Sequence, residues 1–342
     1  MQRDFFASPF QNQDKRLNKL GDPLLELDEL IDWDIFRPVL KQVHARDGRQ
    51  SNAGRKPLDE MMMFRVLVLQ QHYNLSDPQT EYQIEDRRSF RRFIGLHKDV
   101  RSPDHNTIRM FREKLTEKEL LKPLFDTLSA HIESQGFTAK KGQIIDATLV
   151  PVPVQRNSRE ENADIKSGKP PQDWSEEKRR QKDTDARWTK KNGKSHFGYK
   201  NHINVDNEYK IIREYDVTDA SVHDSQVFED ILDEDNSNKE VYADSAYRSE
   251  EAEAFLKEQG YRSKIHRKGK RNKPLTKREQ QGNRTKSQVR VRVEHIFGSI
   301  VTSMGGKQVR TIGLSRAKTK IGLTNLVYNM KRFASISREV AS

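Results

Sequence analysis

The spacing of apolar residues along this 342-residue chain changes near residue 136, and the change divides the chain into two parts. Before it, leucines recur at intervals of three or four residues between Leu17 and Leu30, which is typical of an amphipathic helix. Pro57 and Asp59 begin a second such segment that continues to about Tyr73. No strand-like alternation interrupts residues 14–135, so we expect an all-helical domain over residues 1–135.

Strands and helices alternate after residue 136. The apolar run Gly142–Val150 predicts a first strand, and residues 197–205 and 211–217 predict a hairpin. Beyond the hairpin we expect a helix, a short strand and two further helices, over residues 224–232, 239–244, 249–259 and 287–304. This order predicts an α/β domain over residues 136–342. Residues 155–195 interrupt it with a polar segment, in which we expect a mobile insertion.

The charge of the chain predicts a polyanionic partner. There are 63 Lys and Arg against 51 Asp and Glu, a net charge of +12. Residues 261–292 hold 13 of these basic residues and a single acidic one, Glu279. Clustered positive charge of this kind is typical of proteins that bind nucleic acid. A solvated basic loop is the alternative interpretation.

Several classes of protein are disfavoured. The chain has no cysteine, which excludes disulfides and thiolate metal sites. Its N-terminus has no apolar signal segment, and the apolar run at residues 61–69 is too short to cross a bilayer. No glycine-rich phosphate loop predicts a nucleotide cofactor. We therefore expect a cytoplasmic protein that uses neither membrane nor nucleotide.

Three carboxylates stand where strands and a helix could bring them together. Asp146 lies inside the first predicted strand, Asp244 ends a later strand, and Glu294 lies on the late helix. Hard divalent ions prefer such oxygen ligands, and two ions about 3.5–4 Å apart can activate an attacking oxygen and neutralise a leaving one. We expect these residues to be catalytic and to bind two Mg²⁺ ions, with Mn²⁺ as a substitute.

Each carboxylate also has a structural interpretation. Asp146 could lie on the sheet face opposite the core, and Asp244 could cap a helix or a turn. Glu294 could pair with Arg290 one helical turn away. The hypothesis of a metal site depends on all three residues together.

Short segments spread over most of the chain carry a family resemblance. They are Asp28–Trp33, Ser102–Arg112, Ile145–Thr148, Gly198–His202, Ala220–Asp224, Tyr242–Tyr247, Arg292–Gly298 and Val309–Met330. Together they resemble the DDE transposases of bacterial insertion sequences, in the broad insertion-sequence families four and five. The resemblance implies an RNase H-like catalytic domain with an insertion. It also implies binding of terminal inverted repeats, cleavage and strand transfer into target DNA, and a homodimer on paired ends.

One part of the pattern departs from that family. Its extended glutamate motif often has Tyr, Arg, Glu and Lys in order. Arg290 and Glu294 fit, but Ser287 stands in place of the Tyr and Val301 in place of the Lys. A lysine contact to the element's end must then come from elsewhere, and Lys307 is a candidate.

Further residues are candidates for DNA contact. In the basic stretch they are Arg267, Lys268, Lys270, Arg271, Lys273, Arg290 and Arg292. In the N-terminal domain, Arg109 and Arg112 could belong to a helix-turn-helix reader, although a dimerisation bundle is the alternative. Trp174 and Trp188 of the insertion could stack on unpaired bases or anchor the insertion.

Two other functions remain open on the residues alone. A nuclease of the same fold would cut DNA without joining it. An inactive relative would only bind DNA, although the presence of all three carboxylates disfavours that function. A cleavage assay with Mg²⁺ and a terminal-repeat duplex distinguishes an enzyme from a binding protein.

Overall fold

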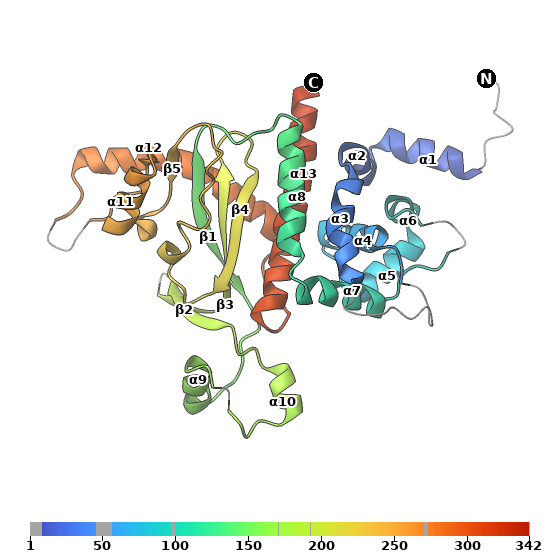
Figure 1. Ribbon diagram of the computed structural model, residues 1–342, viewed down its shortest axis with the longest axis horizontal. Helices are drawn as coiled ribbons and strands as arrows, with labels where there is room; N and C mark the ends of the chain where they lie inside the picture. The colour runs from blue at the N-terminus through green and yellow to red at the C-terminus, as the bar shows by residue number, and fades with distance from the viewer. Residues whose placement is uncertain are drawn as a thin grey trace. The chain divides into compact units, whose positions relative to one another are not determined.

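The computed structural model describes residues 9–45, 57–96, 100–169, 171–191, 193–269 and 273–341. The chain forms two compact units (Figure 1). One comprises the residues up to Leu128 together with those from Met330 onward, and the other comprises Ser129–Asn329. The last helix therefore begins in the second unit and ends in the first.

The first unit is helical throughout its described residues, as the leucine spacing predicted. Its elements are α1 (Pro9–Leu20), α2 (Pro23–Leu30), η1 (Trp33–Phe36), α3 (Arg37–Leu40), η2 (Lys41–His44), α4 (Glu60–His72), α5 (Asp77–Asp86), α6 (Arg88–Phe93), α7 (His105–Glu117) and the start of α8 (Leu121–Ser134). Side chains of Asp59, Ser76 and Asp104 cap α4, α5 and α7. Aromatic rings of Trp33, Phe36 and Phe64 pack at the centre of this unit.

The second unit is built on a mixed sheet. Its strands are β1 (Gln143–Pro151), β2 (Arg187–Lys191), β3 (Lys194–Asp206), β4 (Ile212–Asp219), β5 (Glu240–Tyr242) and β6 (Arg262–Ser263). They lie in the order β2-β3-β1-β5-β6, and β4 pairs with β3. Pairings among β1 to β4 are antiparallel, whereas β5 runs parallel to β1 and to β6.

Helices cover both faces of this sheet. On one face lie α12 (Lys277–Ser303) and α13 (Leu314–Ala341): α12 packs on β1 and β5, and Asn325 of α13 exchanges hydrogen bonds with Asn201 of β3. On the other face, α11 (Glu250–Glu258) contributes Leu256 to a cluster that contains Ile145 of β1. No helix in the described ranges is long and apolar enough to cross a membrane.

Two expectations about this unit were wrong. The predicted helix 224–232 is only the 3-10 turn η3 (Asp224–Gln226). Backbone groups beyond this turn are hydrogen-bonded to strand side chains instead. The side chain of Asn204 donates to the carbonyl of Ile231, and the side chain of Gln143 donates to the carbonyl of Asp233 and accepts the backbone N–H of Asp233. The late helix starts ten residues earlier than expected, because Thr276 and Glu279 form a capping box.

The segment 155–195, in which we expected a mobile insertion, contains α9 (Arg159–Lys166), α10 (Glu176–Gln181) and the edge strand β2. Figure 1 shows α9 and α10 beyond the ends of β2 and β3, away from the sheet. The carboxylate of Asp183 accepts the hydroxyl of Tyr199 in β3 at 2.8 Å and so ties the segment to the sheet.

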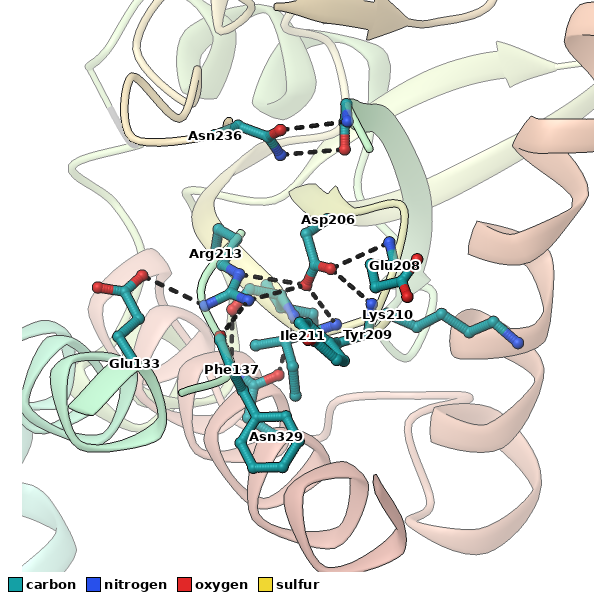
Figure 2. Close-up of polar contacts among 12 residues, drawn as sticks. Glu133, Phe137, Asp206, Glu208, Tyr209, Lys210, Ile211, Arg213, Asn236 and Asn329 are labelled. Atoms are coloured by element: carbon teal, nitrogen blue, oxygen red, sulfur yellow. Dashed lines mark hydrogen bonds and ion pairs between the residues drawn. The ribbon is translucent and has the colours of Figure 1, made fainter. Parts of the chain in front are cut away.

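A buried ionic network holds the turn of the β3–β4 hairpin (Figure 2). The carboxylate of Asp206 is fully buried and accepts backbone N–H groups of Tyr209 and Ile211 as well as the guanidinium of Arg213. Arg213 also donates to Glu133 and to the carbonyl of Phe137. Burial raises the pKa of Asp206 above its ordinary value, and Arg213 opposes that rise. The hairpin therefore depends on an ion pair that is shielded from water.

Replacing Arg213 with Ala should destabilise the second unit strongly. The substitution leaves the carboxylate of Asp206 buried without its counter-ion, which costs about 3–5 kcal/mol in comparable cases. Urea denaturation followed by circular dichroism measures the change. Arg180→Ala is the control, because that arginine forms an exposed pair with Glu176 and should leave the transition unchanged. Equal midpoints for the two variants would contradict the importance of the buried pair.

Candidate active site

The parallel pairing of β1 with β5 brings two of the predicted carboxylates to one place. Gln143 lies opposite Val241 and Ile144 opposite Tyr242. The same register carried two residues further sets Asp146 beside Asp244, just after β5 ends. Both aspartates therefore stand at the same level of adjacent strands.

Asp146 is held in a largely buried ion pair. One carboxylate oxygen lies 3.0 Å from a guanidinium nitrogen of Arg290, and each side chain is 17% exposed. The backbone N–H of Ala147 donates to the other oxygen at 2.9 Å. Burial raises the pKa of the Asp146 carboxyl; Arg290 opposes this rise, and the negative charge of Asp244 adds to it. The two aspartates therefore interact electrostatically.

Asp244 also has the capping role that was its structural alternative. Its side chain accepts the N–H of Ala246 at 2.6 Å and begins the 3-10 turn η4 (Ser245–Tyr247). One oxygen takes part in this cap, so the position of the carboxylate is fixed by the turn that follows β5. A capping aspartate of this kind keeps lone pairs available for another partner.

Glu294 lies on α12, one turn beyond Arg290 and so on the same side of the helix. The neighbouring Val293, Ile296 and Ile300 are buried, whereas Glu294 is exposed. In the described ranges, no three His, Asp or Glu side chains are arranged closely enough to hold a metal ion. The structure thus brings Asp146, Asp244 and Arg290 together and leaves Glu294 exposed on α12.

The residues present have the chemistry that a hard divalent ion requires. Asp146 and Asp244 offer carboxylate oxygens, and a positive group, Arg290, already lies against one of them. Close by, the buried hydroxyl of Tyr247 has no hydrogen-bond partner among the described residues. A second positive group, Lys200, binds Asp224 at 2.7 Å. The donor set fits a cation whose charge would replace that of Arg290.

The basic candidates have different environments. Arg292 donates to the backbone carbonyl of Asn207 at 2.6 Å and also to its side-chain oxygen, so it fastens α12 to the hairpin turn. Arg267 pairs with Glu279 at 2.6 Å. Lys268 and Lys273 are exposed and line a cleft of about 770 Å³ together with Arg267. Lys270 and Arg271 lie outside the described residues.

The two candidates of the helical unit also differ from each other. Arg109 is exposed on α7, where a DNA-contacting residue would need to be. Arg112 lies one turn away but pairs with Asp77 at 2.6 Å and donates to Gln70. In this arrangement Arg112 joins α7 to α4 and α5.

The two tryptophans of the segment 155–195 also differ in their exposure. Trp174 is 5% exposed, its indole N–H donates to Glu161 at 2.8 Å, and Lys178 covers its ring. Trp174 is therefore an anchor of the segment in this arrangement. Trp188 is 46% exposed on β2 and rests on Phe197, so one face remains open.

Residues that the sequence did not single out also belong to this region. Tyr247 follows Asp244 by three positions, inside the Tyr242–Tyr247 segment, so the motif itself contained the signal. Lys200 likewise lies inside the Gly198–His202 segment, whereas Asn207 carried no such signal, because its role depends on a contact with a residue far along the chain.

Family models of transposases match two parts of this chain. A family model described as a transposase DDE domain matches residues 138–330, more than half of the chain. A second model, described as a transposase domain, matches residues 11–114. Among solved structures, the piggyBac transposase in a synaptic complex with hairpin DNA is similar in fold. The TM-score is 0.50 at 13% identity, over 94% of this chain and 76% of the other. The chain therefore belongs to the family of transposases that carry a DDE domain.

Proposed function

We propose that this DNA transposase cuts the ends of its element and joins them to target DNA with a metal site formed by Asp146, Asp244 and Glu294. The observation that carries the proposal is the pair Asp146 and Asp244, which the parallel pairing of β1 with β5 brings to one level, with Arg290 against Asp146. The order of strands and helices around the pair supports an RNase H-like catalytic domain. The domain would act as a homodimer that binds the two terminal repeats.

Two Mg²⁺ ions, or Mn²⁺ in their place, would supply charge neutralisation at the attacking and leaving oxygens of a phosphodiester. The protein's part is to hold its oxygen ligands in place. Asp146 is fixed by β1 and Asp244 by its cap on η4. Glu294 would complete the set from α12, on the side that already faces Asp146 through Arg290.

Arg290 would then move from Asp146 to a phosphate of the bound DNA. A guanidinium binds a phosphate with the same planar fork that it uses for a carboxylate. Its release from Asp146 and the arrival of a metal ion are linked, because both cations compete for one carboxylate. Arg292, which is engaged with Asn207, would position α12 and not contact DNA.

DNA would approach along the cleft lined by Arg267, Lys268 and Lys273. The cleft also includes Ser245, which directly follows Asp244, and Arg248, together with the acidic Glu250, Glu253 and Glu279. The cleft therefore begins next to the second aspartate, and its basic side chains are the ones that would contact phosphates. Among the residues of the N-terminal unit and the segment 155–195, Arg109 and Trp188 are exposed and remain candidates for reading the repeat and for stacking.

Single amide replacements of the carboxylates should abolish both cleavage and joining. Asp146→Asn, Asp244→Asn and Glu294→Gln keep the size of each side chain but remove the charge that a metal ligand needs. A strand-transfer assay with a terminal-repeat duplex and Mg²⁺ measures both steps, and a mobility-shift assay measures DNA binding. Binding should remain largely intact.

The control is Asp230→Asn, an exposed aspartate outside this region, which should behave as the wild type. Near-normal strand transfer by any one of the three amide variants would remove that residue from the catalytic set. Cleavage without joining by the wild type would identify the chain as a nuclease. Neither step, with binding retained, would identify a DNA-binding relative.

Replacing Arg267, Lys268 and Lys273 with Ala should make DNA binding less dependent on salt. Each lost phosphate contact removes a log–log slope of about 0.9 on duplex DNA, so the three together should make the slope shallower by two to three units. Affinity for terminal-repeat and scrambled duplexes should fall alike, because phosphate contacts carry no sequence information. Binding isotherms over a salt series give both quantities.

The matched control replaces Lys141, Lys239 and Arg262, which precede or begin the parallel strands at the end opposite Asp244. These exposed residues carry the same total charge and should leave the slope unchanged. A slope unaffected by the cleft substitutions would show that the basic stretch is a solvated loop. A lost preference for the terminal repeat would place the sequence reader in this cleft.

A further inference from the structure

Tyr247 is a buried tyrosine whose hydroxyl has no hydrogen-bond partner among the described residues. Its side chain is fully buried, with an exposed fraction of 0%, and its oxygen has lost contact with solvent. The equally buried Tyr199 differs, because its hydroxyl donates to Asp183 at 2.8 Å. A buried hydroxyl without a partner is destabilising, so an unpaired one in an otherwise well-packed cluster needs a functional reason.

The position of Tyr247 supplies that reason. It belongs to η4, the turn that Asp244 caps, and its backbone N–H donates to the carbonyl of Asp244. This turn packs against η3, which begins with Asp224. The ring is fixed against Phe228, with 5.7 Å between centroids. Tyr247 therefore cannot move far from the aspartates.

Three carboxylates surround the phenol electrostatically. Burial raises the pKa of Tyr247 well above its ordinary value, and the negative charges of Asp146, Asp224 and Asp244 raise it further. A phenol hydroxyl can donate a hydrogen bond to a carboxylate oxygen. Two of these carboxylates are already paired, Asp146 with Arg290 and Asp224 with Lys200. In this state no carboxylate oxygen accepts the proton of Tyr247.

We propose that Tyr247 is a positioning residue for the metal site: its hydroxyl donates to the Asp146–Asp244 carboxylate pair when a divalent ion takes the place of Arg290. This inference rests on the proposed function. Carboxylates that bind a metal are oriented by hydrogen bonds from neighbouring groups, and loss of such a partner typically weakens metal binding about 10- to 100-fold. The hydroxyl of Tyr247 would then gain its acceptor when the ion binds.

The proposal requires Tyr247→Phe to act in opposite directions with and without metal. In the metal-free protein the substitution removes an unpaired hydroxyl and keeps the ring, so the thermal midpoint should stay equal or rise. The dissociation constant for Mn²⁺ should increase about 10- to 100-fold, because the carboxylates lose their donor. The experiment measures the midpoint of the full chain in EDTA and then titrates Mn²⁺, with free ion detected by electron paramagnetic resonance.

Tyr199→Phe is the matched control. It removes a hydroxyl that is paired with Asp183, so the metal-free midpoint should fall while Mn²⁺ affinity stays at the wild-type value. If Tyr247→Phe leaves Mn²⁺ affinity unchanged, or lowers the metal-free midpoint as Tyr199→Phe does, the inference is overturned and the proposed function stands. If the wild type binds no Mn²⁺, or Asp146→Asn and Asp244→Asn bind it normally, the proposed function fails and the inference fails with it.

Discussion

Two aspartates on adjacent parallel strands repel each other, and the catalytic unit depends on how that repulsion is relieved. Asp146 is too shielded for water to screen its charge, so a cation must lie against it. Arg290 meets this need in the present arrangement. Since Arg290 belongs to α12, the helix is bound to the sheet by the same charge that a metal ion would displace. The metal-free state is therefore an ion-paired state of the site.

The packing and hydrogen bonds that position α12 also stabilise this arrangement. Val293, Ile296 and Ile300 bury one side of the helix on the sheet, and Arg292 fastens it to Asn207 at the hairpin turn. That turn is in turn kept in shape by the buried pair of Asp206 and Arg213 (Figure 2). A substitution that distorts the hairpin turn would thus displace the helix that carries Arg290 and Glu294, although the hairpin contains none of the three candidate catalytic carboxylates.

Local patterns in the sequence predicted those structural features that depend on residues close to one another in the chain. One strand run that contains Asp146 and another that ends at Asp244 predicted that these two side chains lie close together, and the parallel pairing of β1 with β5 brings them to one level. The early start of α12 was also predictable, since Thr276 and Glu279 form a capping signature. The hydrogen bonds of Arg292 were not predictable from the sequence, because their acceptor, Asn207, lies 85 positions away in a turn. The burial of Trp174 likewise depends on how α9 and α10 fold against each other.

The segment between β1 and β2 leaves and re-enters the sheet at one point. Pro151 lies opposite Gly198 in the β1–β3 ladder, and the N–H of Val152 donates to the carbonyl of Phe197 at 3.0 Å. Gly198 allows this close approach, with φ at +152° and room for no Cβ, which would lie 2.4 Å from the carbonyl oxygen of Val150. The β1–β3 strands pair where the segment leaves the sheet, and this pairing does not depend on the length of the segment. The entropic cost of closing a longer loop rises only slowly with its length. Evolution can therefore lengthen, shorten or exchange this module without disturbing the register that aligns the aspartates.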